Sequence, residues 1–153
     1  GFMDRSEETM ADRLTPEARS RNMAQIRSRD TGPELRVRRA AHALGLRFRL
    51  HRRDLPGTPD LVFPGRRIAL FVHGCFWHRH TGCRLAYTPK SRIEFWQAKF
   101  EGNVARDRRK ESDLQKAGWM PVVIWECETR DPDRLAGIIR DRVMRHPVLT
   151  PDR

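Results

Sequence analysis

The distribution of apolar residues along the chain predicts buried strands in its middle and late parts. We expect strands over 60–63, 67–73 and 119–125, because each of these segments is built mainly of apolar residues and has the length of a buried strand. The Pro64-Gly65 turn separates the first two runs, so we expect them to pair as an antiparallel hairpin. Basic and apolar residues alternate over 47–51, which predicts a half-exposed strand.

Helical spacing of apolar residues predicts helices around these strands. We expect helices over 17–27, 34–44 and 92–116, and a last one after Asp131-Pro132. The order strand, long helix, strand indicates a crossover connection within a mixed sheet. The sequence therefore predicts an α/β fold with a mixed central sheet flanked by helices.

The two ends of the chain differ from this central region. Residues 1–14 are charged and lack periodic apolar positions, which is typical of a flexible arm, and we interpret Gly1-Phe2 before Met3 as a cloning remnant. Residues 147–153 form a short tail that contains proline. This leaves a single expected domain over 15–146.

Charge and cysteine usage narrow the function classes. The formal net charge is +11, from 31 Lys+Arg against 20 Asp+Glu, and such an excess favours nucleic acid as partner. An arginine-rich composition that reflects a GC-rich genome is the alternative. No apolar run approaches the roughly 18 residues of a membrane span, and no signal peptide is visible. Three cysteines without a secretion signal suit metal ligation in a reducing cytoplasm.

A ligand-rich loop follows the second strand of the hairpin. It holds Cys75, His78, His80 and Cys83 within nine residues, and Cys127 closes the later strand. Cys75-x4-His80-x2-Cys83 with Cys127 gives a Cys₃His set, which is typical of a closed structural zinc site. Two alternatives are buried free cysteines and a site that uses His78 in place of His80.

Asp60 and two histidines are candidates for catalysis. The hairpin would carry Asp60, which opens one strand, and His73, which closes the other, towards the same end. With His78 they could bind Mg²⁺, activate water and stabilise a pentavalent phosphate. A core histidine is the alternative for His73. Glu34 lies in the first turn of a predicted helix, where a carboxylate is usually a helix-dipole partner.

Phe76, Trp77 and Trp96 are large aromatics in a polar part of the chain. Such residues often form a small satellite core. In a basic DNA-binding protein they could instead be wedges that insert between base pairs.

Several segments resemble the bacterial very short patch repair endonucleases. These are RSRNMAQIRSRDTGPE, PGTPDLVF, FVHGCFWHRH, EFWQAKFEGNVARDRR and GWMPVVIWEC, which occur in unbroken order over roughly 19–130. The resemblance implies a type II restriction-endonuclease-like fold with a structural zinc site. It also implies a DNA mismatch endonuclease that nicks the T-containing strand 5′ to the T of a T·G mismatch arising from deamination of 5-methylcytosine.

The resemblance assigns roles to individual residues. It implies that Asp60 and the backbone carbonyl of Val72 bind Mg²⁺, with His78 as general base, His73 at the phosphate and Glu34 as an acid near the site. It further implies that zinc is bound by Cys75, His80, Cys83 and Cys127. The residues that it implies intercalate in DNA are Phe76, Trp77 and Trp96. The chain departs from the family pattern by one additional residue before Cys83, at Thr81-Gly82.

These expectations describe a cytoplasmic, monomeric bacterial enzyme. Its partner is double-stranded DNA with a T·G mismatch, and mismatch-repair factors are possible further partners. Two other functions remain open from the sequence. One is a zinc-stabilised DNA-binding module without catalysis, which would have no use for Asp60 facing phosphate. The other is a restriction-type endonuclease, which would dimerise and cut both strands.

Overall fold

The computed structural model describes residues 31–146. The expected arm over 1–14, the helix over 17–27 and the tail over 147–153 lie outside the described residues. The single domain over 15–146 stays a prediction.

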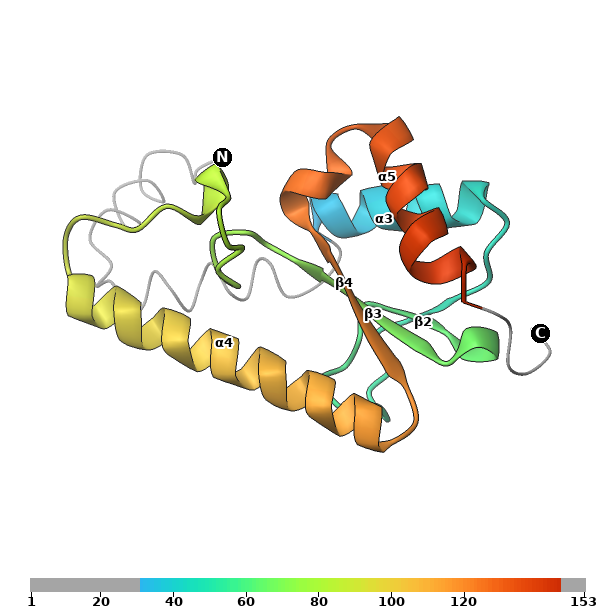
Figure 1. Ribbon diagram of the computed structural model, residues 1–153, viewed down its shortest axis with the longest axis horizontal. Helices are drawn as coiled ribbons and strands as arrows, with labels where there is room; N and C mark the ends of the chain where they lie inside the picture. The colour runs from blue at the N-terminus through green and yellow to red at the C-terminus, as the bar shows by residue number, and fades with distance from the viewer. Residues whose placement is uncertain (1–30, 147–153) are drawn as a thin grey trace, which may run out of the picture. The chain divides into compact units, whose positions relative to one another are not determined.

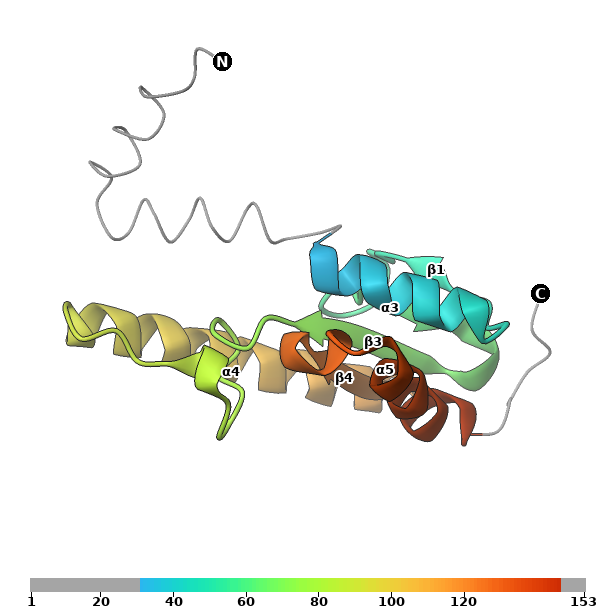
Figure 2. The same cartoon turned by 90° about the horizontal axis from the view of Figure 1, so that it is seen from above.

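In the described residues, four strands form one mixed sheet in the order β1-β2-β3-β4. Figure 1 labels β2, β3 and β4, and Figure 2 labels β1. The strands are β1 (Arg49–Leu50), β2 (Leu61–Phe63), β3 (Ile68–His73) and β4 (Met120–Trp125). β2 pairs antiparallel with β1 and β3, whereas β3 and β4 are parallel. The predicted hairpin and the mixed sheet are therefore confirmed.

The strand predicted over 47–51 is shorter in the structure, with two residues in β1. His51 adopts a positive φ of 46°, so the chain leaves the extended conformation there. A short 3₁₀ turn, η1 (Pro64–Arg66), closes the hairpin between β2 and β3. Its tight geometry sets the register, which places Phe63 opposite Ile68 and Leu61 opposite Leu70.

Within residues 31–146, three α-helices flank the sheet. They are α3 (Gly32–Ala43), α4 (Ile93–Lys116) and α5 (Pro132–Ile139), and η4 (Arg140–Met144) continues α5 as a π-helical turn. Two further 3₁₀ turns are η2 (Arg84–Ala86) and η3 (Glu126–Thr129). Figures 1 and 2 show α3 and α5 on one side of the sheet and α4 on the other, with α4 in the crossover between β3 and β4.

The alternation of side chains along the strands builds an apolar core on each face. On one face, Leu61, Ile68 and Leu70 pack with Val37 of α3 and Ile139 of α5. On the other, Val62, Ala69 and Phe71 pack with Leu114 of α4 and with Trp119. Burial on both faces explains why β2 and β3 are continuous apolar runs in the sequence. Among the described helices, none combines the length and the apolar character that crossing a membrane requires.

Candidate active site and metal centre

Asp60 lies directly before β2, and its carboxylate reaches across the hairpin to β3. Its Oδ2 atom accepts a hydrogen bond from the backbone N–H of Val72 at 2.7 Å. Burial raises the pKa of Asp60 to about 6, and the bond from Val72 opposes that rise. Among residues 31–146, no lysine or arginine forms an ion pair with Asp60. A buried carboxylate without a cationic partner suits a divalent cation.

A second carboxylate and a histidine lie beside Asp60. Nε2 of His51 is 2.7 Å from Oε2 of Glu34, which also contacts Arg38, and Glu34 is buried. The backbone N–H of His51 donates to the carbonyl oxygen of Asp60 at 3.2 Å. Glu34, His51 and Asp60 each offer a ligand atom within 4.8 Å of the others. The sequence analysis missed His51. This histidine directly follows β1, which pairs with the strand that begins after Asp60, and its position there was a usable signal.

The two candidate histidines, His73 and His78, stack on each other, with ring centroids 3.9 Å apart and 6° between the planes. Nδ1 of His78 lies 2.6 Å from Oδ2 of Asp107, in the middle of α4. Burial of Asp107 works to raise its pKa, but the hydrogen bond with His78 and the charge interactions with His78, His73 and Lys110 together outweigh it, so the pKa is lowered. Burial lowers the pKa of His73 to about 3, so this imidazole is neutral near pH 7.

Asp107 is therefore the carboxylate that touches the histidine pair, and the sequence analysis missed it. We expected Asp60 to face both histidines. The structure brings Asp60 close enough to His78 for their charges to interact, whereas the hydrogen bond of His78 goes to Asp107. A surface groove of about 460 Å³ runs past these side chains, lined also by Arg108 and Glu111 of α4.

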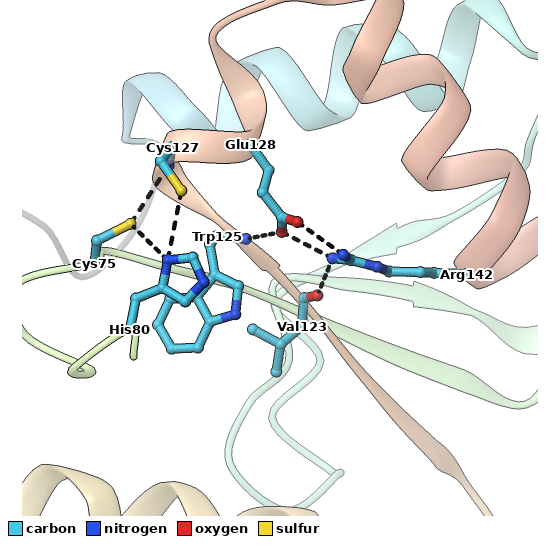
Figure 3. A network of polar contacts seen from close by, with 7 residues as sticks. All are labelled: Cys75, His80, Val123, Trp125, Cys127, Glu128 and Arg142. Atoms are coloured by element: carbon cyan, nitrogen blue, oxygen red, sulfur yellow. Dashed lines mark hydrogen bonds and ion pairs between the residues drawn. The ribbon is translucent and has the colours of Figure 1, made fainter. Parts of the chain in front are cut away.

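The predicted Cys₃His residues come together in one cluster. Figure 3 shows three of them, Cys75, His80 and Cys127. Nδ1 of His80 lies 3.6 Å from Sγ of Cys75 and 3.4 Å from Sγ of Cys127, and Cys83 offers the fourth ligand atom, all within 4.8 Å. The three cysteines are free thiols. Three thiols and one imidazole at this spacing fit a tetrahedral zinc site. The ligand atoms that lie within 4.8 Å of one another belong to His80 and the three cysteines and not to His78, whose Nδ1 lies 2.6 Å from Oδ2 of Asp107.

Parallel pairing of β3 and β4 explains how Cys75 meets the distant Cys127. Their last residues, His73 and Trp125, are register partners, so the segments that follow begin side by side. Cys75 comes two residues after the end of β3, and Cys127 lies in η3 directly after β4. The backbone N–H of Cys127 donates to Sγ of Cys75 at 3.4 Å. Trp125 stacks on the ring of His80, with centroids 4.3 Å apart.

The three aromatic candidates contact one another beside this cluster. The ring of Phe76 lies 5.0 Å from that of Trp77 and 5.7 Å from that of Trp96, and it also contacts Phe100. Trp77 is 7% exposed, whereas Phe76 and Trp96 are half-buried. The rings thus form a small apolar cluster in the structure, with Trp77 at its buried end.

Arg79 ties the aromatic loop to α4, and the sequence analysis missed this role. Its guanidinium donates to the carbonyl oxygens of Phe76, Ala86 and Tyr87 at 3.2, 2.9 and 3.1 Å. The same group lies over the ring of Phe100, 3.9 Å from the centroid. One side chain therefore holds both ends of the loop in a fixed arrangement.

Sequence comparisons identify the family. The model of the family described as DNA mismatch endonuclease Vsr matches residues 11–84. A type II nicking enzyme of Xanthomonas oryzae is 55% identical over 132 residues, which is 86% of this chain and 96% of that protein. The DNA mismatch endonuclease Vsr of Escherichia coli is 44% identical over 126 residues, 82% of this chain and 80% of that one.

The chain belongs to the DNA mismatch endonuclease Vsr family. A further relative, a type II nicking enzyme of Neisseria meningitidis, is 37% identical over 89% of this chain and 94% of its own length. Membership confirms the resemblance inferred from the sequence segments. The structure likewise confirms an α/β fold with a mixed sheet. In this Vsr-family chain, a Cys/His cluster and two clusters of acids with histidines converge at the same end of β3.

Proposed function

We propose that this Vsr-family protein is a Mg²⁺-dependent endonuclease that nicks one strand of DNA at a T·G mismatch. The cut lies 5′ to the T, in the strand that contains it, and starts the repair of deaminated 5-methylcytosine. The observation that carries the proposal is the buried carboxylate of Asp60, which has no described cationic partner and lies close to the His78–Asp107 pair. A protein that only binds DNA has no use for an acid that repels phosphate.

Asp60 and the backbone carbonyl of Val72 are the proposed ligands for Mg²⁺. Oxygen ligands suit this hard cation, and Glu34 adds negative charge beside the site. When bound, the ion supplies Lewis-acid polarisation of the scissile phosphate and lowers the pKa of a water molecule. Without a cation, burial destabilises the charged form of the Asp60 carboxylate, and this is why its pKa is raised.

His78 is the proposed general base. Its Nδ1 is engaged by Asp107, so Nε2 is the nitrogen that accepts a proton from the attacking water. The water oxygen forms the new bond to phosphorus and the bond to the 3′ oxygen breaks. The 3′ oxygen takes a proton from solvent to become a hydroxyl, and the proton on the imidazole returns to solvent. Asp107 holds the ring in one tautomer and stabilises the imidazolium that forms.

His73 is the proposed phosphate-contacting histidine. Because burial keeps it neutral, it acts as a hydrogen-bond donor rather than as a positive charge. Its stacking on His78 fixes the orientation of that ring as well. Both histidines border the groove beside α4, where a phosphate group would enter.

The remaining sites support substrate recognition. Cys75, His80, Cys83 and Cys127 would hold zinc, which would fix the loop that carries Phe76 and Trp77. Phe76, Trp77 and Trp96 are proposed to insert beside the mismatch, where unstacking costs less than in paired DNA. The formal charge of +11 favours binding to the phosphate backbone. The proposed working form is a cytoplasmic monomer on mismatched duplex DNA, with mismatch-repair factors as candidate partners.

A cleavage assay on duplexes that carry T·G in many flanking contexts tests this proposal. We expect one nick per duplex, in the T strand, that needs Mg²⁺ or Mn²⁺. Cleavage of both strands would support a restriction-type enzyme instead. Tight mismatch binding without a nick in any context would support a binding module.

A further inference from the structure

A half-buried ion pair lies beside the Cys₃His cluster, between Glu128 of η3 and Arg142 of η4 (Figure 3). Nη1 of Arg142 donates to Oε1 of Glu128 at 2.8 Å, and Nη2 donates to Oε2 at 2.7 Å. The Glu128 side chain is 9% exposed, and that of Arg142 is 38% exposed. This bidentate geometry is the strong form of a charge-assisted hydrogen bond, and it fixes direction as well as distance.

The pair also binds the backbone on both sides of the strand end. Oε1 of Glu128 accepts the backbone N–H of Trp125 at 2.9 Å, and Nη1 of Arg142 donates to the carbonyl oxygen of Val123 at 2.9 Å. The last residues of β4 and the first turn of η3 are thereby held to η4. Cys127 lies inside this braced segment, one residue before Glu128.

The braced segment contacts the cluster through more than the Cys127 thiol. The backbone N–H of Cys127 donates to Sγ of Cys75, and Glu126 accepts the backbone N–H of Cys75 at 3.3 Å. Trp125, whose N–H the pair holds, stacks on His80. The position of η3 therefore affects three of the four candidate ligands.

We propose that Arg142, acting through Glu128, is a positioning residue that holds Cys127 in place for zinc before the metal binds. This inference rests on the proposed zinc site. Two physical effects support it. The brace reduces the conformational freedom that metal binding would otherwise have to remove. The guanidinium also offsets the charge of a carboxylate that would repel a cluster of thiolates.

The test compares zinc affinity in variants of the purified, zinc-loaded protein. Arg142→Met removes the brace, Arg142→Lys keeps the charge without the bidentate geometry, and Arg145→Met is the matched control. Arg145 directly follows η4, and its ion pair with Asp141 is exposed. Zinc transfer to a chromophoric chelator is measured well below the unfolding temperature, and Co²⁺ absorption reports thiolate coordination.

We expect Arg142→Met to bind zinc about 10- to 100-fold more weakly than wild type, as loss of a residue that orients a metal ligand usually does. The zinc affinity of Arg142→Lys should lie between those of Arg142→Met and wild type, and that of Arg145→Met should equal that of wild type. Equal affinity in folded Arg142→Met or Arg142→Lys and in wild type would overturn the inference. If Arg142→Met does not fold, Arg142→Lys decides the outcome. A folded wild type that binds neither Zn²⁺ nor Co²⁺ would instead refute the zinc site itself.

Discussion

Nδ1 of His78 lies 2.6 Å from Oδ2 of Asp107, which joins the loop after β3 to the middle of α4. The contact leaves Nε2 of His78 for substrate, while the stacked ring of His73 limits rotation. An acid that fixes the tautomer of a histidine is the usual support for a general base. This arrangement suggests that α4 contributes to the active site as well as to the sheet crossover.

The first prediction concerns this pair. His78→Ala should slow nicking by roughly 10²–10⁴-fold, since a general base contributes about that much. Asp107→Asn should also slow it, by a smaller factor, because the ring remains but its tautomer is no longer fixed. In single-turnover assays, the double variant should be no slower than His78→Ala alone. Additive losses would show that the two residues act separately.

The second prediction concerns the stability cost of Asp60. Its pKa is about 6 in the folded protein and 3.8 as the ordinary value. The folded state therefore favours the protonated form of Asp60. The resulting contribution to the free energy of unfolding is fully present below pH 3.8 and is lost as the pH rises through about 6. Without added Mg²⁺, Asp60→Asn should be more stable than wild type at pH 8, by about 2–3 kcal/mol.

Urea unfolding at pH 4 and pH 8 measures this difference. At pH 4, the gain in the free energy of unfolding of Asp60→Asn over wild type should shrink towards zero. Asp54→Asn is the control, because Asp54 is exposed and its pKa is lowered by the bond from Arg52, so this change should bring no gain. A stability gain from Asp60→Asn that is equal at both pH values would contradict the assigned burial cost.

Local patterns were sufficient to predict the hairpin, the crossover and the grouping of the cysteines with His80. The apolar runs and the turn at Pro64-Gly65 specify the pairing of β2 with β3, and ligand spacing groups Cys75 with His80 and Cys83. Asp107 could not be found this way. It lies in a highly charged stretch of α4, and only the packing of that helix selects one of several similar carboxylates.

The third prediction separates mismatch recognition from general binding. Replacing Phe76 and Trp77 with Ala should level the affinities for T·G and fully paired duplexes, because the wedges favour a step that is easier to unstack. Trp77→Ala alone should also destabilise the fold, by about 3–5 kcal/mol, since its ring is buried. Fluorescence anisotropy measures the affinities, and thermal unfolding measures the stability.

Met120→Ala provides the control for these aromatic variants. Met120 is 40% exposed at the start of β4, at the opposite end of that strand from the zinc cluster. This change should alter neither the preference for T·G nor the overall affinity. Survival of the mismatch preference in the double aromatic variant would mean that Phe76 and Trp77 are ordinary packing residues.

The fourth prediction concerns the metal content. Elemental analysis of the purified protein should find about one zinc per chain, and Cys127→Ala should lower that content because it removes one of four ligands. Burial raises the pKa of the Cys75 thiol to about 12 in the metal-free cluster, so zinc binding near pH 7 should release protons from it. Calorimetry in buffers of different ionisation enthalpy measures this release. A metal-free protein that is fully folded and active would refute the site.

The most direct test of the proposed mechanism is a nicking assay on a T·G duplex with each strand labelled, with wild type and Asp60→Asn side by side. Wild type should cut only the T strand, 5′ to the T, and only with Mg²⁺ or Mn²⁺. Asp60→Asn should bind the duplex at least as well, since it loses a charge that repels phosphate, and should not cut it. Equal nicking rates for the two proteins would contradict the assignment of Asp60 as the metal-binding carboxylate.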